Sequence, residues 1–229
     1  MKHTVSTLIN SRKLFFGNML LLLLLSILSL TLFGRSIAFI PSNAYHPFWL
    51  NVFFINYTFI GNGLFVICMA AVIMIRFKKM REGTALLYGF IFSDIIIQVL
   101  KNINHISQPA LFIEQGQYIF SPADISTGSF ISGHTTIAFA WITVLVLIIK
   151  NPVWQLPLLA AAILLGYSRI YLAQHFLMDI VIAAVTGTIS GIAGVYLAYY
   201  SKGYQFHFKK LVSIHKNRMI PAGENIQPV

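Results

Sequence analysis

The chain has 229 residues, of which 57% are hydrophobic and only 10% are charged. Soluble domains carry about a quarter of their residues as charged side chains, so this composition excludes an ordinary soluble protein. The net charge of +10 does not indicate a nucleic-acid module, because the cations punctuate long apolar runs and do not gather on one polar face.

Six apolar runs are candidates for membrane-spanning helices. A helix of about 20 apolar residues crosses a hydrocarbon core of about 30 Å, and backbone in lipid must be helical or part of a closed barrel. The chain is therefore predicted to be an all-α polytopic membrane protein with six transmembrane helices in one domain, residues 1–200. The expected helices are Leu14 to Phe33, Phe48 to Ile75, Ala85 to Leu100, Ile131 to Ile149, Val153 to Leu172 and Phe176 to Tyr200.

The first run has a second interpretation as a secretory signal, because Lys2, Arg12 and Lys13 precede a leucine-rich stretch. The run is long for a signal, and the small residues Ser36 and Ala38 make a weak cleavage site. A first spanning helix is the favoured interpretation.

Basic residues orient the six helices. Short cytoplasmic loops retain Lys and Arg, and an amino terminus inside the cell leaves only Arg35, Lys101 and Arg169 on the outer side. Both termini are therefore predicted to be cytoplasmic, with residues 201–229 forming a basic cytoplasmic tail. The cations on the inner side are Lys2, Arg12, Lys13, Arg76, Lys78, Lys79, Arg81, Lys150, Lys202, Lys209, Lys210, Lys216 and Arg218.

Two side chains within the apolar runs lead to further expectations. Cys68, the single cysteine, excludes a disulfide within the chain and is expected to be a buried thiol. Asp94 is costly inside a membrane and is expected to bind a polar partner on a neighbouring helix, with a substrate or proton pathway as the alternative. The last helix also carries small residues that should permit close helix packing. They are Ala183, Gly187, Gly191 and Gly194.

His175 and Asp179 form the first candidate catalytic pair. They are four residues apart, so on a helix they share a face, and the carboxylate can accept a hydrogen bond from one imidazole nitrogen. The other nitrogen is then free to act as a nucleophile or base. Arg169 has a planar guanidinium that suits two phosphate oxygens. It would lie near His175 and Asp179 only if the chain made a short turn near Ala173 and Gln174. A simple structural hydrogen bond is the alternative for the pair.

Ser132, Gly133 and His134 are expected to begin a helix. Ser132 is a suitable N-cap, Gly133 lets a ligand approach the backbone, and the helix amino terminus favours an anion. His134 would then lie in the first turn, where it could protonate a departing oxygen. Lys101 falls on the same predicted side of the membrane.

These segments resemble the signature motifs of the type 2 phosphatidic acid phosphatases, a family that includes glucose-6-phosphatases and vanadium haloperoxidases. The third family motif is Ser-Arg, five residues, His, three residues, Asp, and this chain matches every fixed position. The second motif, Pro-Ser-Gly-His, is matched except that Ile131 replaces proline. In the first motif, Lys, six residues, Arg-Pro, Lys101 and Pro109 match but Gln108 replaces the arginine. The third-motif residues are Ser168, Arg169, His175 and Asp179.

The resemblance implies a lipid phosphatase that forms a phosphohistidine. His175 would attack phosphorus while Asp179 orients it, and His134 would protonate the leaving oxygen and then activate water. Gln108 offers a weaker, neutral donor than the family's arginine. Phosphate would be held by Lys101, Arg169, Gln108 and the amides around Ser132 and Gly133.

No cofactor or metal is expected, because the outer side offers only Glu114, Asp124 and Asp179, which are far apart in sequence. The expected partner is a phosphorylated lipid in the membrane, and the sequence does not indicate an oligomeric state. Resemblance to compact bacterial members implies a cytoplasmic (inner) membrane with the site facing the periplasm. The sequence leaves open hydrolysis of a lipid phosphate or pyrophosphate, a lipid phosphotransferase, and a catalytically inactive membrane protein.

Overall fold

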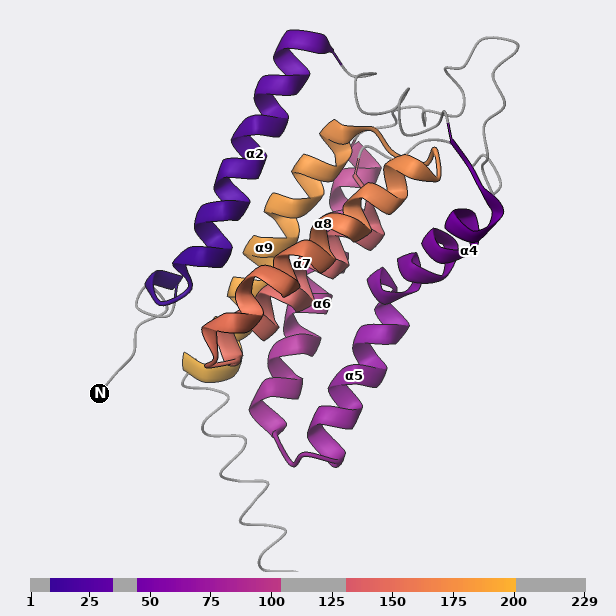
Figure 1. Ribbon diagram of the computed structural model, residues 1–229. Helices are drawn as coiled ribbons and strands as arrows, with labels where there is room; N and C mark the ends of the chain where they lie inside the picture. Colours follow the sequence, from indigo (N-terminus) through magenta and orange to yellow (C-terminus); the bar gives the residue numbers. More distant parts are fainter. Residues whose placement is uncertain (1–8, 35–44, 104–130, 201–229) are drawn as a thin grey trace, which may run out of the picture.

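The computed structural model describes residues 9–34, 45–103 and 131–200. Within these ranges the chain is helical and has no strand (Figure 1). In chain order the elements are α2 (Lys13–Phe33), α4 (Phe48–Tyr57), the 3-10 turn η1 (Thr58–Gly61), α5 (Gly63–Ile75), α6 (Met80–Ile103), α7 (Gly133–Ile148), the 3-10 turn η3 (Pro152–Trp154), α8 (Gln155–Tyr171) and α9 (Leu177–Tyr200).

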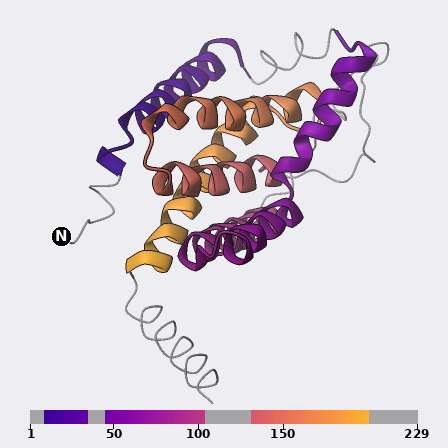
Figure 2. The same cartoon turned by 60° about the horizontal axis from the view of Figure 1, so that its bottom comes forward.

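Helices α6, α7 and α9 form the centre of the bundle. Seen from one end, α7 lies between α8 and the α5–α6 pair (Figure 2), and most of its side chains are buried. A Cβ added to Gly191 would lie 2.5 Å from the Ala140 carbonyl oxygen, and one added to Gly194 would lie 2.5 Å from the Gly89 nitrogen. The predicted small-residue stripe on α9 is therefore confirmed, because it brings the backbones of α6, α7 and α9 into close contact.

Helix α2 lies at the edge of the bundle and is anchored at its amino-terminal end. Its leucines are largely exposed, as expected for a face that meets lipid. Arg12 is buried and donates from Nε to the Val146 carbonyl oxygen at 2.8 Å, while the Gln155 side chain accepts from the Phe15 amide at 3.2 Å. These contacts fix the start of α2 where α7 ends and α8 begins.

The expected single helix from Phe48 to Ile75 is wrong, because the chain breaks at Asn62 and bends by 59°. Asn62 has extended backbone angles, and its side chain accepts a hydrogen bond from the Leu64 amide, which caps the start of α5. A Cβ added to Gly61 would lie 2.6 Å from the His134 carbonyl oxygen. Glycine at this position therefore lets the break press directly against α7.

By length and apolar composition, four helices in the described residues can cross a membrane, and the bent pair makes a possible fifth. The fifth expected span, Val153 to Leu172, begins within the 3-10 turn η3 and continues as α8, and α7 is a shorter apolar helix of 16 residues. The described part of the chain thus supports four to five spans, and the sixth remains a prediction. The expectation of a buried Cys68 is wrong, since the thiol is exposed. An apolar position in such a chain can face lipid as well as the core.

Candidate active site

The predicted motif residues lie at the ends of four helices. Lys101 is in the last turn of α6, His134 is in the first turn of α7, Arg169 is in the last turn of α8, and Asp179 is in the first turn of α9. The connection between α8 and α9 lies at the opposite end of the molecule from the turn between α5 and α6 (Figure 1). The tail 201–229 and Gln108 lie outside the described residues.

A tight turn after α8 brings Arg169 and His175 together. Ala173 has a φ of 56°, which is the left-handed conformation that usually follows a helix. The Gln174 amide donates to the Arg169 carbonyl oxygen at 3.0 Å, and the Ala173 amide donates to that of Ile170, also at 3.0 Å. This pair of hydrogen bonds is a Schellman motif. The His175 amide also donates to the Arg169 carbonyl, at 3.2 Å, so the predicted turn at Ala173 and Gln174 is confirmed.

His175 is buried and faces Asp179 across 3.4 Å, from imidazole Nδ1 to carboxylate Oδ2. This distance is at the long end of the hydrogen-bond range. The same Oδ2 accepts from the Phe176 amide at 3.0 Å, so Asp179 also caps the start of α9. With Nδ1 donating to Asp179, the Nε2 lone pair of His175 is left available.

Burial lowers the pKa of His175 below its ordinary value of 6.5. The hydrogen bond and the negative charge of Asp179 act in the opposite direction, while the charges of Arg169 and Lys101 lower the pKa further. The net effect favours the neutral imidazole. Neutral imidazole is the form that can attack phosphorus.

Arg169 is 8% exposed and only partly satisfied by the protein. One terminal nitrogen donates to the Thr58 hydroxyl at 2.8 Å, but the buried Nε has no hydrogen-bond partner among the described residues. The buried Oε1 of the neighbouring Gln174 also lacks one. A buried unpaired donor costs about 1–3 kcal/mol. A bound phosphate oxygen would relieve this cost at Arg169.

Ser132 caps α7, as the sequence predicts. Its hydroxyl is 2.8 Å from that of Thr135, and it accepts from the Thr135 amide at 3.4 Å. The side chain is fully buried in this cap, which leaves backbone amides of the first turn to meet a ligand. Among the described residues other than its chain neighbours, the nearest atom to a Cβ added at Gly133 would be a methyl of Ile97 at 3.9 Å, an ordinary van der Waals distance, so the position has room for a methyl group.

The charged and titratable side chains of the site interact electrostatically with one another. His134 experiences the charges of Arg169, His175 and Lys101, and His175 experiences those of Arg169, Asp179 and Lys101. The structure therefore brings together the side chains that the sequence placed on one side of the membrane. The group is rich in positive charge, and a phosphate is the kind of ligand that it fits.

A polar cavity of about 220 Å³ opens between α6, the start of α7 and the break before α5. Lys101, Gly133 and His134 line it together with Asp94 and further residues. The expected helix partner for Asp94 is not found, because no hydrogen bond or ion pair holds its carboxylate among the described residues. Three further residues of the site were not predicted from the sequence. They are Thr58, Asn62 and Gln98. The Gly-Asn-Gly sequence inside an apolar run was an available signal for Asn62 alone.

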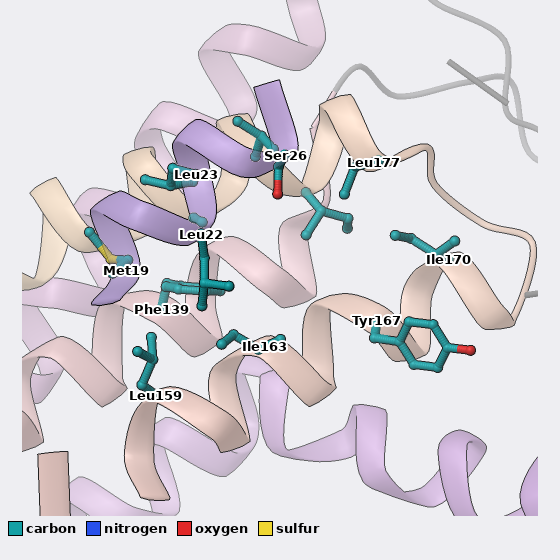
Figure 3. A pocket seen from close by; sticks show the side chains of 13 residues that line it. Met19, Leu22, Leu23, Ser26, Phe139, Leu159, Ile163, Tyr167, Ile170 and Leu177 are labelled. Atoms are coloured by element: carbon teal, nitrogen blue, oxygen red, sulfur yellow. The ribbon is translucent and has the colours of Figure 1, made fainter. Parts of the chain in front are cut away.

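A second cavity, also of about 220 Å³, lies between α2, α7, α8 and α9. Figure 3 shows Leu22, Phe139 and Ile163 among the side chains that point into it, with Ile170 and Leu177 toward the turn after α8. Its lining is almost wholly apolar and includes no charged side chain, so it suits hydrocarbon better than a phosphate.

The described residues contain no cluster of three or more His, Cys, Asp or Glu side chains that could hold a metal ion. In this part of the chain His175 and Asp179 form a pair without a third such ligand.

An all-helical membrane bundle with a cationic, two-histidine site at its helix ends is the class of protein defined by these observations. The PAP2 superfamily, the type 2 phosphatidic acid phosphatases, matches residues 82–203. That match covers more than half of the chain and includes all four motif-bearing helices. The chain belongs to this family.

Individual relatives agree with the family. A lipid A 1-phosphatase from Rhizobium johnstonii is 27% identical over 107 residues, which are 46% of this chain and 43% of that protein. The chain thus spans less than half the length of this curated relative. The crystal structure of Aquifex aeolicus LpxE has a TM-score of 0.60 at 27% identity, covering 70% of this chain and 94% of that one. The phosphatidylglycerolphosphate phosphatase of Bacillus subtilis shares the fold, with a TM-score of 0.58 at 17% identity over 90% of this chain and 98% of that one.

Proposed function

We propose that this protein is an integral membrane phosphatase that hydrolyses a lipid phosphate through a phosphohistidine on His175. The observation that carries the proposal is the group of two imidazoles, one guanidinium and one ammonium whose charges act on one another. Relatives that are lipid phosphatases support the substrate class.

In the first step, Nε2 of His175 attacks phosphorus and the bond from phosphorus to the lipid oxygen breaks. Asp179 keeps Nδ1 of His175 engaged and stabilises the positive charge that develops on the ring. His134 gives its proton to the departing lipid oxygen. Lys101, Arg169 and the amides of the first turn of α7 hold the phosphoryl oxygens, and the unpaired Nε of Arg169 is one of these donors.

In the second step, water attacks the phosphohistidine from the side that the lipid has left. His134, now neutral, accepts a proton from this water, while the bond from phosphorus to His175 breaks. Inorganic phosphate departs, and both histidines return to their starting protonation states. The two imidazoles must therefore lie on opposite sides of the phosphorus atom.

The proposed setting is a bacterial cytoplasmic membrane crossed by six helices, with the bent α4–η1–α5 unit counted as one and the short α7 as another. Both termini would be cytoplasmic and the site would face the periplasm. The distribution of Lys and Arg supports this orientation.

Release of inorganic phosphate from purified protein tests the function. The panel should contain phosphatidic acid, phosphatidylglycerol phosphate, lipid A and undecaprenyl pyrophosphate, each assayed with wild type and with His175→Ala. We expect phosphate release by the wild type alone, without an acceptor lipid. Phosphate that appears only on a second lipid would identify a phosphotransferase, and a folded wild type inactive on the whole panel would identify a non-catalytic membrane protein. Repeating the panel with Gln108→Arg measures what the altered first motif contributes.

A further inference from the structure

The two imidazoles divide the site into a nucleophile side and a leaving-group side. In an in-line reaction these lie on opposite sides of phosphorus, so a lipid attacked by His175 departs toward His134. The polar cavity is lined by His134, Lys101 and Gly133 and by no residue of the segment from Arg169 to Asp179. It therefore lies on the leaving-group side, a conclusion that rests on the proposed function.

One wall of this cavity is a polar stripe on α6. Asp94, Gln98 and Lys101 follow one another at intervals of four and three residues, so they share a face of the helix, and all three line the cavity. Asn62 faces the same space from the break before α5. A volume of about 220 Å³ is smaller than the sites of drug-sized ligands. It suits the part of a headgroup beside the phosphate and is too small for a whole lipid.

Asp94 determines which hydrogen-bonding groups such a headgroup must carry. Its carboxylate lies within a helix that can cross a membrane, and no hydrogen bond or ion pair holds it among the described residues. An ionised carboxylate accepts hydrogen bonds and donates none. A ligand that satisfies it must carry a donor.

We propose that Asp94, with Gln98 and Asn62, forms a leaving-group subsite that accepts a hydrogen bond from a hydroxyl or amino group next to the scissile phosphate. The substrate class is then a phosphate monoester of a lipid whose headgroup is a sugar or another polyol. A lipid pyrophosphate is a poorer substrate, because its leaving group is an anion that meets Asp94 as a like charge.

Three substrates test this subsite with the full-length chain in detergent. The first is 1-oleoylglycerol 3-phosphate, the second is its 2-O-methyl ether, and the third is farnesyl pyrophosphate. The first two have the same chain and phosphate and differ in one hydrogen-bond donor. We expect a kcat/KM about tenfold higher for the free alcohol than for the ether in the wild type, the scale of one hydrogen bond to a charged group.

Two substitutions separate the role of Asp94 from general damage. Asp94→Leu should lower kcat/KM for the alcohol about tenfold more than for the ether, which abolishes the preference, and Asp94→Asn should reduce the preference and speed hydrolysis of the pyrophosphate. Ser93→Ala is the matched control, because Ser93 is the adjacent residue on α6 and its hydroxyl donates to the Phe90 carbonyl of its own helix at 2.7 Å. This control should keep the wild-type preference.

Equal rates for alcohol and ether in the wild type would overturn the subsite and leave the phosphatase standing. An equal loss on both substrates in Asp94→Leu and Asp94→Asn would also overturn it, because Asp94 would then act on structure or on phosphate. Absence of phosphate release by the wild type from these three substrates and from the lipid panel above would contradict the proposed function itself, whereas release from the panel but not from 1-oleoylglycerol 3-phosphate would overturn the subsite.

Discussion

The surroundings of His175 act on its pKa in opposite directions. Burial and the neighbouring cations favour the neutral ring, while Asp179 favours the charged ring. The spacing of four residues predicts the His175–Asp179 contact, because helix geometry alone brings the two side chains together. The contact between Arg169 and Thr58 joins residues 111 positions apart, and no local pattern could predict it.

The titration of His175 provides the first prediction. Because its pKa lies below 6.5, the ring of the free enzyme stays neutral at pH 6.5 and gains its proton only as the pH falls further. In Asp179→Asn the raising influence is lost, so the pKa should fall further still, while activity drops about 100-fold or more because orientation and charge stabilisation are lost. Histidine NMR of the substrate-free protein measures the pKa. A His175 that titrates above 6.5 would contradict this account.

Gly133→Ala tests whether a ligand occupies the space beside α7. Among the described residues beyond its chain neighbours, the nearest atom to the new methyl group would be 3.9 Å away, so the free protein should fold with an unchanged melting temperature. A phosphate at the helix amino terminus would meet the methyl group, and we expect kcat/KM to fall at least about tenfold. Wild-type kcat/KM in this variant would show that phosphate does not approach the backbone at Gly133.

At the scale of elements, the segment formed by η1 and the break at Asn62 contributes to the site, although it lies outside the sequence motifs. It supplies Thr58 to Arg169, and its Ile60 carbonyl accepts from the indole of Trp141 on α7 at 3.0 Å. Apolar composition predicted one continuous helix here, because hydropathy indicates which segments can lie in lipid but not where the backbone changes direction. The length of the run and its Gly-Asn-Gly sequence were the signals for a break.

Gly61→Ala should disturb both the break and α7. The added Cβ would lie 2.6 Å from the His134 carbonyl oxygen, so one of the two backbones must move. We expect a loss of about 1–3 kcal/mol in unfolding free energy and a lower kcat. Thermal unfolding in detergent measures the first, with Gly17→Ala as the matched control, since no atom of the described residues lies within 4 Å of a Cβ there. Equal stability of the two variants would contradict the close packing described here.

At the scale of the whole molecule, the sequence predicted the helical class, the family and the side of the bundle on which the motif residues gather. It placed the ends of α2, α7 and α9 within two residues of their positions in the structure. It could not predict the polar cavity, because its walls come from segments that meet only after the helices pack. The Asp94 expectation failed for the same reason, since a polar side chain within a span can face a cavity as well as a partner.

The six-span arrangement predicts which side of the membrane each connection reaches. In a Cys68→Ser background, an impermeant thiol reagent applied from the periplasm should label Asn102→Cys at the end of α6. It should not label Lys79→Cys, before the start of α6. Both wild-type residues are exposed, so accessibility within the protein does not limit the reaction. The reverse labelling pattern would show that the orientation is inverted.

Trapping of the covalent intermediate tests the central claim most directly. Wild type and His175→Ala are mixed with a ³²P-labelled lipid phosphate and quenched in alkali, which preserves phosphohistidine. The account predicts that label appears on the peptide containing His175 in the wild type and is absent from the variant, which also releases no phosphate. Label on another residue, or continued turnover by His175→Ala, would contradict it.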